Sequence, residues 1–348
     1  MKILVYSRNF LPDLGGLESN TLTLASSLTR LGHTTVVLTE TLDDNGAIYS
    51  FKTIRSRGYM ALLKAVLASD LVFINGGLSM KACSMSWLLR RKYVPIYQTS
   101  ELFIRNDAGS VPSKIRRSVA GSAAMSVTVS FYAQTCLKQL LPFHTVFGLP
   151  NPIDPELEEI ALQSSSKIHD KKYDLLFAGR IIDGKGVFHL VDAVAALRPA
   201  LDLTVAFAGD GEHRDALLAY ASQKGIRFSY LGRLDKAQLV EAYQSARVLV
   251  VPSSTHTEGN PLVIAEALSL GTPVIASDQP AMVEAVGDAG LIFRRGDSNE
   301  LKRTIASLFF DGELERVTAS TSGRRDEFSY QRYLERLQVI LASAQLLY

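Results

Sequence analysis

Two glutamates, Glu258 and Glu266, are separated by seven residues and enclose a segment suited to binding an anion. Within this segment, Asn260 is a good N-cap and Pro261 suits the first position of a helix. The backbone amides near Leu262 would then lie at a helix start, where the helix dipole also favours negative charge. Glu258 precedes that start, and the side chain of Glu266 would lean back towards it. We therefore expect an anion site beside two carboxylates that accept hydrogen bonds from hydroxyl groups of a ligand.

Two cations lie ahead of these glutamates in the sequence. Gly179-Arg180 ends one predicted strand, and Lys185-Gly186 opens the next predicted helix. An arginine and a lysine at one strand end can bind the same anion, the arginine through paired N–H groups. Together they predict a site for a diphosphate, whereas either cation alone would more often be a surface charge.

Two adjacent glycines, Gly15 and Gly16, follow the first predicted strand. Their spacing does not match the GxGxxG dinucleotide fingerprint, but they would let a phosphate or a sugar approach the backbone closely. A tight turn between a strand and a helix would need the same residues, so both interpretations stay open. For Glu258 and Glu266 the alternative is a solvated surface position, which the apolar residues around Glu266 make less favoured.

These candidates lie where strand-like runs give way to helical periodicity. The predicted strands are 3–7, 35–39, 70–75 and 95–99 in the first half and 174–179, 203–208, 228–231, 248–251 and 274–277 in the second. They are apolar along their whole length, which is typical of parallel strands covered on both faces. Helical segments such as 17–31 and 80–91 alternate with them, so the sequence predicts an α/β fold with doubly wound sheets. Ligands of such sheets bind beyond the carboxyl ends of the strands, and we expect a cleft that faces both halves.

The length and composition predict two well-packed domains. A chain of 348 residues, 47% hydrophobic and 21% charged, is too long for one ordinary core and too apolar to be disordered. The alternation of strands and helices restarts after Asn151-Pro152, so we expect domains over 1–150 and 151–328. Two cysteines, Cys83 and Cys136, exclude a disulfide framework. With a strand rather than a signal peptide at 3–7, they predict a cytoplasmic location.

Charge is distributed unevenly along the chain. Residues 1–150 hold 16 basic and 8 acidic residues, and the remainder holds 21 basic and 27 acidic residues. The basic runs Arg90–Lys92 and Lys114–Arg117 suit peripheral contact with anionic lipid on the inner face of a membrane, or with an acidic acceptor. Solvated helix faces are the alternative. Nucleic acid is not an expected partner, because aromatic residues are not interleaved with the basic clusters.

The glutamate spacing and a series of short segments resemble the retaining GT-B glycosyltransferases of family four, the glycosyl transferases group 1. The other segments are 10–12 with 15–16, 151–154, 178–180 with 185–186, 208–211, 231–234 and 271–276. Each segment is a weak signal by itself. Their order and spacing along nearly the whole chain are highly specific.

The resemblance implies a GT-B fold, with two Rossmann-like doubly wound parallel-sheet domains facing a central cleft. The second domain would bind a UDP-, GDP- or ADP-sugar donor, and the first a saccharide or lipid-linked acceptor. A C-terminal helix over about 329–346 is expected to pack back on the first domain. The implied reaction is sugar transfer with retention, in bacterial cell-surface polysaccharide or glycolipid synthesis, without a metal or a cofactor. The chain contains no Asp-x-Asp motif, through which other transferases bind a divalent cation.

The resemblance also assigns roles to individual residues. Arg180 and Lys185 would neutralise the leaving diphosphate. Glu258 would contact the donor sugar, and Glu266 the ribose. Gly15 and Gly16 would lie against the donor phosphates or the acceptor. The other residues expected around the donor are Gly179, Gly209, Gly232, Leu234, Gly259, Asn260, Pro261, Leu262 and Val263.

One position departs from the family pattern. Family members commonly carry a histidine shortly after the strand that corresponds to 95–99, and Glu101 takes its place here. A carboxylate there would accept a hydrogen bond from a sugar or act on the acceptor proton, or it would simply start a helix. This departure keeps a non-catalytic glycosyltransferase-like binding subunit open as an alternative. A sugar-nucleotide epimerase or a phosphorylase of the GT-B shape is the other alternative.

Overall fold

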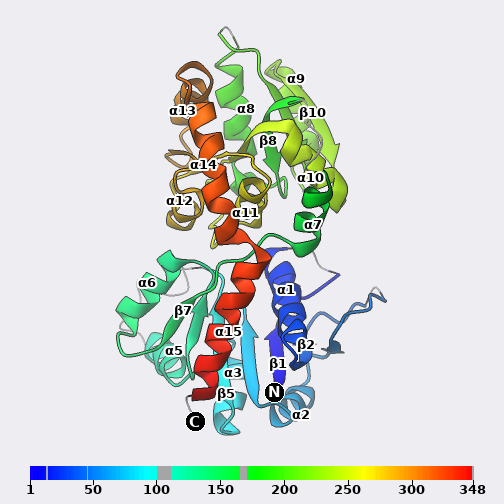
Figure 1. Ribbon diagram of the computed structural model, residues 1–348, viewed down its shortest axis with the longest axis vertical. Helices are drawn as coiled ribbons and strands as arrows, with labels where there is room; N and C mark the ends of the chain where they lie inside the picture. Colours follow the sequence, from blue (N-terminus) through cyan, green and yellow to red (C-terminus); the bar gives the residue numbers. More distant parts are fainter. Residues whose placement is uncertain (13–14, 45, 100–110, 165–170, 199, 347–348) are drawn as a thin grey trace. The chain divides into compact units, whose positions relative to one another are not determined.

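The computed structural model describes residues 1–12, 15–44, 46–99, 111–164, 171–198 and 200–346. The chain divides into two compact units (Figure 1). The first unit consists of Met1–Pro150 and Leu334–Tyr348, and the second of Asn151–Tyr333. Each unit has its own sheet, and the C-terminal helix begins in the second unit and continues into the first.

The first unit is built on a seven-stranded parallel sheet with the strand order β3-β2-β1-β4-β5-β6-β7. Its strands are β1 (Lys2–Ser7), β2 (Thr34–Thr39), β3 (Lys52–Arg55), β4 (Leu71–Asn75), β5 (Lys92–Tyr97), β6 (Ser126–Thr128) and β7 (Val146–Gly148). Its helices are α1 (Gly16–Arg30), α2 (Tyr59–Leu67), α3 (Met80–Leu88), α5 (Val111–Gly121), α6 (Phe131–Leu140) and, from Leu334 on, α15 (Tyr330–Leu346). The last helix is held to the sheet in part by Lys92, whose Nζ donates to the carbonyl of Ala344 at 3.0 Å.

The second unit is built on a six-stranded parallel sheet with the order β10-β9-β8-β11-β12-β13. Its strands are β8 (Tyr173–Ala178), β9 (Thr204–Ala208), β10 (Arg227–Gly232), β11 (Ala246–Val251), β12 (Val274–Ser277) and β13 (Gly290–Phe293). Its helices are α7 (Pro155–Ser164), a 3₁₀ turn (Asp183–Lys185), α8 (Val187–Ala195), α9 (Arg214–Gln223), α10 (Lys236–Ser245), α11 (Leu262–Ser269), α12 (Pro280–Val286), α13 (Ser298–Phe310) and α14 (Glu313–Phe328).

Alternating side chains of the central strand β8 enter two different cores. Leu176 packs with residues of α10 and α11, such as Ile264, on one face of the sheet. Leu175 and Phe177 pack with residues of α8 and α13 on the other face. Because successive side chains of a strand point to opposite faces, a strand that is apolar throughout needs cover on both sides. This double cover confirms the prediction of doubly wound parallel sheets.

The chain order of the strands reverses direction once in each sheet. The reversal lies between β1 and β4 in the first unit and between β8 and β11 in the second. At such a switch point, the loops leaving the carboxyl ends of the two strands turn away from each other and open a space for ligands. Within the described residues, no helix is both long and apolar enough to cross a membrane.

Candidate functional site

The switch point of the second unit brings together Lys185, which follows β8, and Glu258, which follows β11. The Nζ of Lys185 lies 2.5 Å from Oε1 of Glu258, and the two side chains are only 18% and 8% exposed. The hydroxyl of Ser253 donates to the same carboxylate oxygen at 2.7 Å. The sequence predicted both charged residues for one site, but it gave no signal that they pair.

Gln279, directly before α12, holds the loop that carries Glu258. Its Oε1 accepts a hydrogen bond from the backbone N–H of Glu258 at 2.9 Å. Its Nε2 donates to the carbonyls of Ser253 at 3.1 Å and His256 at 3.0 Å. Gln279 is 3% exposed, so these backbone groups would have little access to water without it. Gln279 was not predicted as a site residue, because nothing in its spacing links it to Glu258.

Two glycines allow the turn that carries Lys185 to pack directly on the loop after β11. Gly186 has a φ of +69°, and a Cβ added to it would lie 1.9 Å from the carbonyl oxygen of Pro252. The carbonyl of Gly184 accepts hydrogen bonds from the backbone N–H groups of Ser254 and His256. This backbone contact fixes Lys185 against the strand end from which Glu258 follows.

The helix after Glu258 begins one residue later than the sequence predicted. Pro261, with φ −68° and ψ 118°, is the N-cap of α11, and the first helical residue is Leu262. The prediction that Asn260 is the N-cap is therefore wrong, because the ring of Pro261 fixes φ but leaves ψ free to be extended. The amides of Leu262 and Val263 still lie in the first turn, where they have no acceptor within the helix. Gly259 and Asn260 form the loop that leads into this turn.

Glu266 lies in the middle of α11, and its carboxylate faces α10. The hydroxyl of Tyr243 donates to its Oε2 at 2.8 Å. Burial raises the pKa of Glu266 to about 7, and this hydrogen bond only partly opposes the effect. The nearby carboxylate of Asp154 raises the pKa further, whereas Lys236 lowers it. Near neutral pH, Glu266 can therefore either accept or donate a hydrogen bond.

The predicted glycines meet at the carboxyl ends of three neighbouring strands. Gly179 follows β8, Gly209 follows β9 and Gly232 ends β10. The backbone N–H of Gly209 donates to the carbonyl of Gly232 at 2.7 Å, and a Cβ on Gly209 would lie 1.9 Å from the carbonyl oxygen of Gly179. Close backbone contact is a sufficient structural reason for Gly209. Gly232 has open space beside it, and Leu234 packs against the core.

Arg180 lies at the same edge of the sheet as Lys185, directly after β8. Its side chain is exposed, and among the described residues it makes no hydrogen bond or ion pair. This leaves its guanidinium available to an anion from solvent. The structure thus places both predicted cations at the carboxyl end of β8, with only Lys185 fixed by a partner.

In the first unit, the predicted glycines start α1. Gly15 is the N-cap, with an extended φ of −176°, and Gly16 is the first helical residue. A Cβ on Gly15 would lie 2.5 Å from a carboxylate oxygen of Glu18, whereas Gly16 has nothing within 4 Å of that position. Glu101, the other candidate of this unit, lies outside the described residues.

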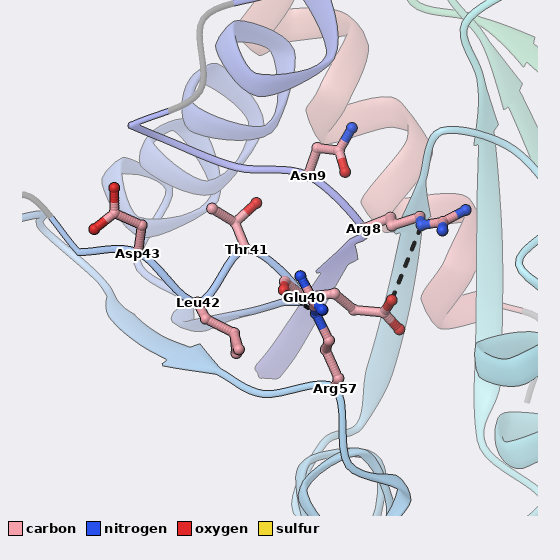
Figure 2. Close-up of a pocket in the computed structure, with 7 residues that line it drawn as sticks. All are labelled: Arg8, Asn9, Glu40, Thr41, Leu42, Asp43 and Arg57. Carbon is pink, nitrogen blue, oxygen red and sulfur yellow. Dashed lines mark hydrogen bonds and ion pairs between the residues drawn. The ribbon is translucent and has the colours of Figure 1, made fainter.

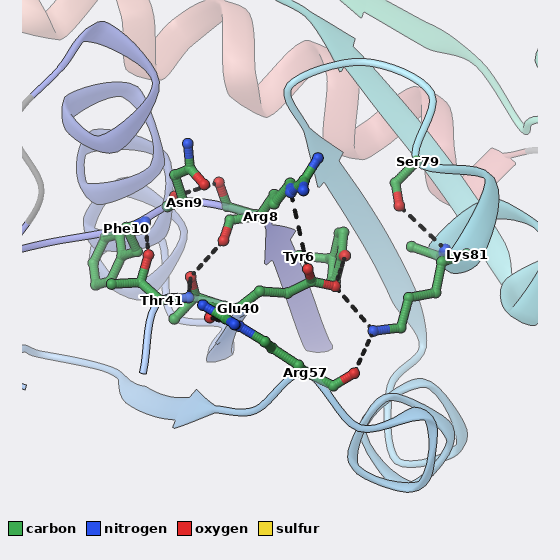
Figure 3. Close-up of polar contacts among 12 residues, drawn as sticks. Tyr6, Arg8, Asn9, Phe10, Glu40, Thr41, Arg57, Ser79 and Lys81 are labelled. Atoms are coloured by element: carbon green, nitrogen blue, oxygen red, sulfur yellow. Dashed lines mark hydrogen bonds and ion pairs between the residues drawn. The ribbon is translucent and has the colours of Figure 1, made fainter. Parts of the chain in front are cut away.

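The first unit also has a polar pocket that sequence analysis missed. It lies at the carboxyl ends of β1, β2 and β3 and is lined by Arg8, Asn9, Glu40, Thr41, Leu42, Asp43 and Arg57 (Figure 2). Glu40 pairs with Lys81, whose Nζ lies 2.9 Å from its Oε1, and accepts a hydrogen bond from Tyr6 at 2.8 Å (Figure 3). These residues come from separate segments of the sequence, so no local spacing could have identified them. Among the described residues, no group of three or more His, Cys, Asp or Glu side chains could hold a metal ion.

Part of the second unit is similar to known sequences. Residues 159–324 match the family Glycosyl transferases group 1. The 2-deoxystreptamine glucosyltransferase of Streptomyces kanamyceticus is 30% identical over 195 residues, which are 52% of this chain and 50% of that protein. The GDP-mannose-dependent monoacylated alpha-(1-6)-phosphatidylinositol monomannoside mannosyltransferase of Corynebacterium glutamicum is 29% identical over 176 residues, 47% of this chain and 45% of that protein. The chain thus spans half or less of the length of these curated relatives.

Comparison with solved structures covers both units. HepE of Anabaena, solved in complex with UDP, has a TM-score of 0.77 and 19% identity, with 99% of this chain and 100% of that chain covered. Sucrose-phosphate synthase from Thermosynechococcus elongatus has a TM-score of 0.76 and 21% identity, with coverage of 99% and 98%. At such identities the likeness shows the fold alone. It confirms the prediction of a GT-B fold with two Rossmann-like domains.

Proposed function

We propose that this chain is a retaining glycosyltransferase that moves a sugar from a nucleoside diphosphate to a saccharide or lipid-linked acceptor. The observation that carries the proposal is the pairing of Lys185 with Glu258 at the switch point of the second sheet. The pair lies inside the segment that matches Glycosyl transferases group 1. The structural neighbour solved with UDP supports a nucleoside diphosphate as the carrier.

Each residue of the second-unit site has side-chain or backbone chemistry that suits one role in the transfer reaction. As the bond between the sugar carbon and the diphosphate oxygen breaks, negative charge develops on the diphosphate. Arg180, Lys185 and the first-turn amides of α11 would stabilise that charge in a partly dehydrated site. The carboxylate of Glu258, held by Lys185 and Ser253, would accept hydrogen bonds from hydroxyl groups of the donor sugar. Glu266 would bind the ribose, and the backbone near Gly232 and Leu234 the base.

The acceptor hydroxyl then attacks the sugar carbon from the face that the diphosphate leaves, so the configuration is retained. The new bond joins the sugar carbon to the acceptor oxygen, the acceptor's hydroxyl proton passes to the diphosphate oxygen that leaves from the same face, and the nucleoside diphosphate departs. The resemblance to family four carries this retaining step, together with the expectation that no metal or cofactor takes part. A cytoplasmic enzyme acting on surface polysaccharide or glycolipid precursors, in peripheral contact with the membrane through its basic first domain, is part of the same proposal.

Calorimetric titration of the full chain with UDP, GDP and ADP tests the donor site. We expect one nucleotide to bind, and Arg180→Gln and Lys185→Gln each to weaken it by about tenfold or more, because each removes a charged hydrogen bond. Lys172→Gln is the matched control, because Lys172 also pairs with a glutamate, Glu241 at 2.7 Å, but lies directly before β8 at the opposite edge of the sheet. Absence of binding by all three nucleotides would overturn the proposal.

Incubation with UDP-glucose, GDP-mannose and ADP-glucose separates the alternative functions. A glycosyltransferase releases nucleoside diphosphate as it transfers or hydrolyses the sugar. Conversion of the donor to an isomer without acceptor would instead identify an epimerase. Nucleotide binding without any turnover, across a screen of saccharide and lipid-linked acceptors, would identify a binding subunit.

A further inference from the structure

The polar pocket of the first unit contains none of the residues proposed to bind the donor. It has a volume of about 500 Å³ and lies where three adjacent strands of the first sheet end. Arg8 and Asn9 follow β1, Glu40 to Asp43 follow β2, and Arg57 follows β3. Figure 2 shows these side chains around the opening between the three loops. The pocket thus occupies the edge of the sheet at which α/β proteins bind ligands.

Hydrogen bonds between the loops hold the walls of this pocket in place. The carbonyl of Arg8 accepts from the backbone N–H of Glu40 at 3.1 Å and from the hydroxyl of Thr39 at 3.2 Å. The backbone N–H of Phe10 donates to the hydroxyl of Thr41 at 3.1 Å, and the ring of Phe10 is fully buried. The loops after β1 and β2 are therefore one connected structure, and a ligand would meet a preformed surface.

Two guanidinium groups in the pocket keep most of their hydrogen-bonding capacity. The side chain of Arg8 is 82% exposed, and its Nε lies 4.0 Å from Oε2 of Glu40. The Nε of Arg57 donates to the carbonyl of Glu40 at 3.2 Å. Among the described residues, neither guanidinium makes a closer contact with a carboxylate. Their paired N–H groups match the geometry of a phosphate or a carboxylate.

Glu40 is held as a carboxylate with one oxygen directed to the pocket. Its Oε1 accepts from Lys81 and Tyr6, whereas its Oε2 lies towards Arg8 (Figure 3). Burial alone would raise the pKa of Glu40, but the hydrogen bonds from Lys81 and Tyr6 and the charges of Lys81 and Arg8 lower it overall. Because Lys81 already pairs with Glu40, this carboxylate only partly offsets the positive charge of Arg8 and Arg57.

Building on the proposed function, we propose that this pocket binds an anionic group of the acceptor. Arg8 and Arg57 bind the phosphate or carboxylate, and Oε2 of Glu40 accepts a hydrogen bond from a neighbouring hydroxyl group of the acceptor. Asn9 and Thr41 supply further polar contacts to a hydroxylated body, and Leu42 is the only lining residue with an aliphatic side chain. The acceptor class is therefore a sugar with a phosphate, including a lipid-linked sugar phosphate, or a sugar with a carboxylate.

Ligand-detected NMR titration of the full chain tests this assignment, with the nucleotide that binds in the calorimetric titration present to occupy the donor site. The probes are glucose 1-phosphate, glucuronate, inorganic phosphate and glucose. We expect glucose 1-phosphate or glucuronate to bind about tenfold or more tightly than glucose, since a neutral sugar forms no charged pair with either arginine. The preferred probe tells whether phosphate or carboxylate is the natural anion. Inorganic phosphate shows how much of the affinity the anion supplies alone.

The variants Arg8→Gln and Arg57→Gln should each weaken binding of the anionic probe by about tenfold and leave the affinity for glucose unchanged. Arg91→Gln is the matched control, because Arg91 also donates to a backbone carbonyl, that of Leu67 at 2.9 Å, but lies directly before β5 at the opposite edge of the sheet. Equal binding of charged and neutral probes, or equal losses in all three variants, would overturn the assignment.

The affinity for the nucleotide identified by calorimetry separates this inference from the proposed function. We expect Arg8→Gln and Arg57→Gln to bind that nucleotide as the unmodified chain does, because both residues belong to the first unit and the donor residues to the second. A chain that selects anionic probes through Arg8 and Arg57 but binds no nucleotide would retain the pocket and refute the glycosyltransferase proposal. A chain that binds a nucleotide but does not prefer anionic probes over glucose would refute the pocket assignment and leave the glycosyltransferase proposal standing.

Discussion

The ammonium group of Lys185 lies 2.5 Å from the carboxylate of Glu258, and both side chains are largely withdrawn from solvent. The two residues follow neighbouring strands, β8 and β11, on either side of the point where the strand order reverses. The contact therefore has two consequences. It stabilises the loops at the switch point, and it keeps a cation and an anion fixed where a charged ligand of the sheet would bind.

Replacing Lys185 should show how much its ion pair with Glu258 contributes to the stability of the fold. We expect Lys185→Met to lower the free energy of unfolding by about 3 kcal/mol, because the buried carboxylate of Glu258 would lose its cation. Adding Glu258→Gln should restore most of the loss, since an amide oxygen still accepts from Ser253 and needs no counter-charge. Urea denaturation of both variants measures the effect. Unchanged stability of Lys185→Met would show that the pair contributes to ligand binding only.

Gly186 should be the least replaceable glycine in the turn that carries Lys185. Gly186→Ala places a Cβ 1.9 Å from the carbonyl oxygen of Pro252 at a φ of +69°, so strain and a backbone clash act together. We expect a loss of about 3 kcal/mol or more in unfolding free energy. Gly271→Ala is the control, because Gly271 has a φ of +80° but open space beside it, and it should cost only about 1 kcal/mol. Similar losses in the two variants would mean that the turn can move away from Pro252.

The sequence was sufficient for the central strands and the spaced motif residues, and insufficient for contacts that only the topology creates. Strands such as β8 and β11 are apolar runs of six residues, whereas β3, β7 and β13 have three or four residues and give almost no periodic signal. These short strands were not predicted. Their pairing with longer neighbours, rather than their own pattern, makes them strands.

The candidate sites divide in the same way. Lys185, Glu258 and Glu266 could be predicted because they lie in motifs of fixed spacing. Gln279 and Tyr243 could not, because they reach the site from separate helices and their distance along the chain carries no information. The first-unit pocket is the clearest case, since Arg8, Glu40 and Arg57 meet only because β1, β2 and β3 are adjacent.

Gln279 should be sensitive to the smallest possible chemical change. Gln279→Glu keeps the shape but replaces the Nε2 donor with oxygen, so the carbonyls of Ser253 and His256 would face a carboxylate. We expect a loss of about 2–4 kcal/mol in unfolding free energy, because two buried acceptors lose their donor. Gln238→Glu is the matched control. There the side chain only accepts, from the N–H of Asp235 in a capping box, and glutamate serves equally well.

Thermal or urea unfolding of the two glutamate variants provides the comparison. Gln238→Glu should remain close to the unmodified chain, whereas Gln279→Glu should lose both stability and nucleotide affinity. If Gln279→Glu were as stable as Gln238→Glu, the loop before α11 would not depend on the two donated hydrogen bonds.

Glu266 should make stability depend on pH in a direction unusual for a carboxylate. Its pKa is raised from 4.5 to about 7 by burial, so between these values the folded chain holds a proton that the unfolded chain has released. Stability from this group therefore falls as pH rises through that window, by about 1.4 kcal/mol per pH unit and about 3 kcal/mol in all. Above the pKa of Glu266 in the folded state, the loss of stability stays constant. Tyr243, Asp154 and Lys236 are the groups that set the shift.

Glu266→Gln isolates this effect, because glutamine imitates the protonated acid and does not titrate. Relative to the unmodified chain, we expect this variant to have similar stability near pH 4 and to be more stable by about 3 kcal/mol near pH 8. Urea denaturation of both proteins at several pH values measures the difference. The affinity for the nucleotide that binds should change with pH near 7 in the unmodified chain and lose that dependence in Glu266→Gln, because only the glutamate changes between hydrogen-bond acceptor and donor at the ribose. A stability difference that is the same at every pH would show that Glu266 titrates at its ordinary value.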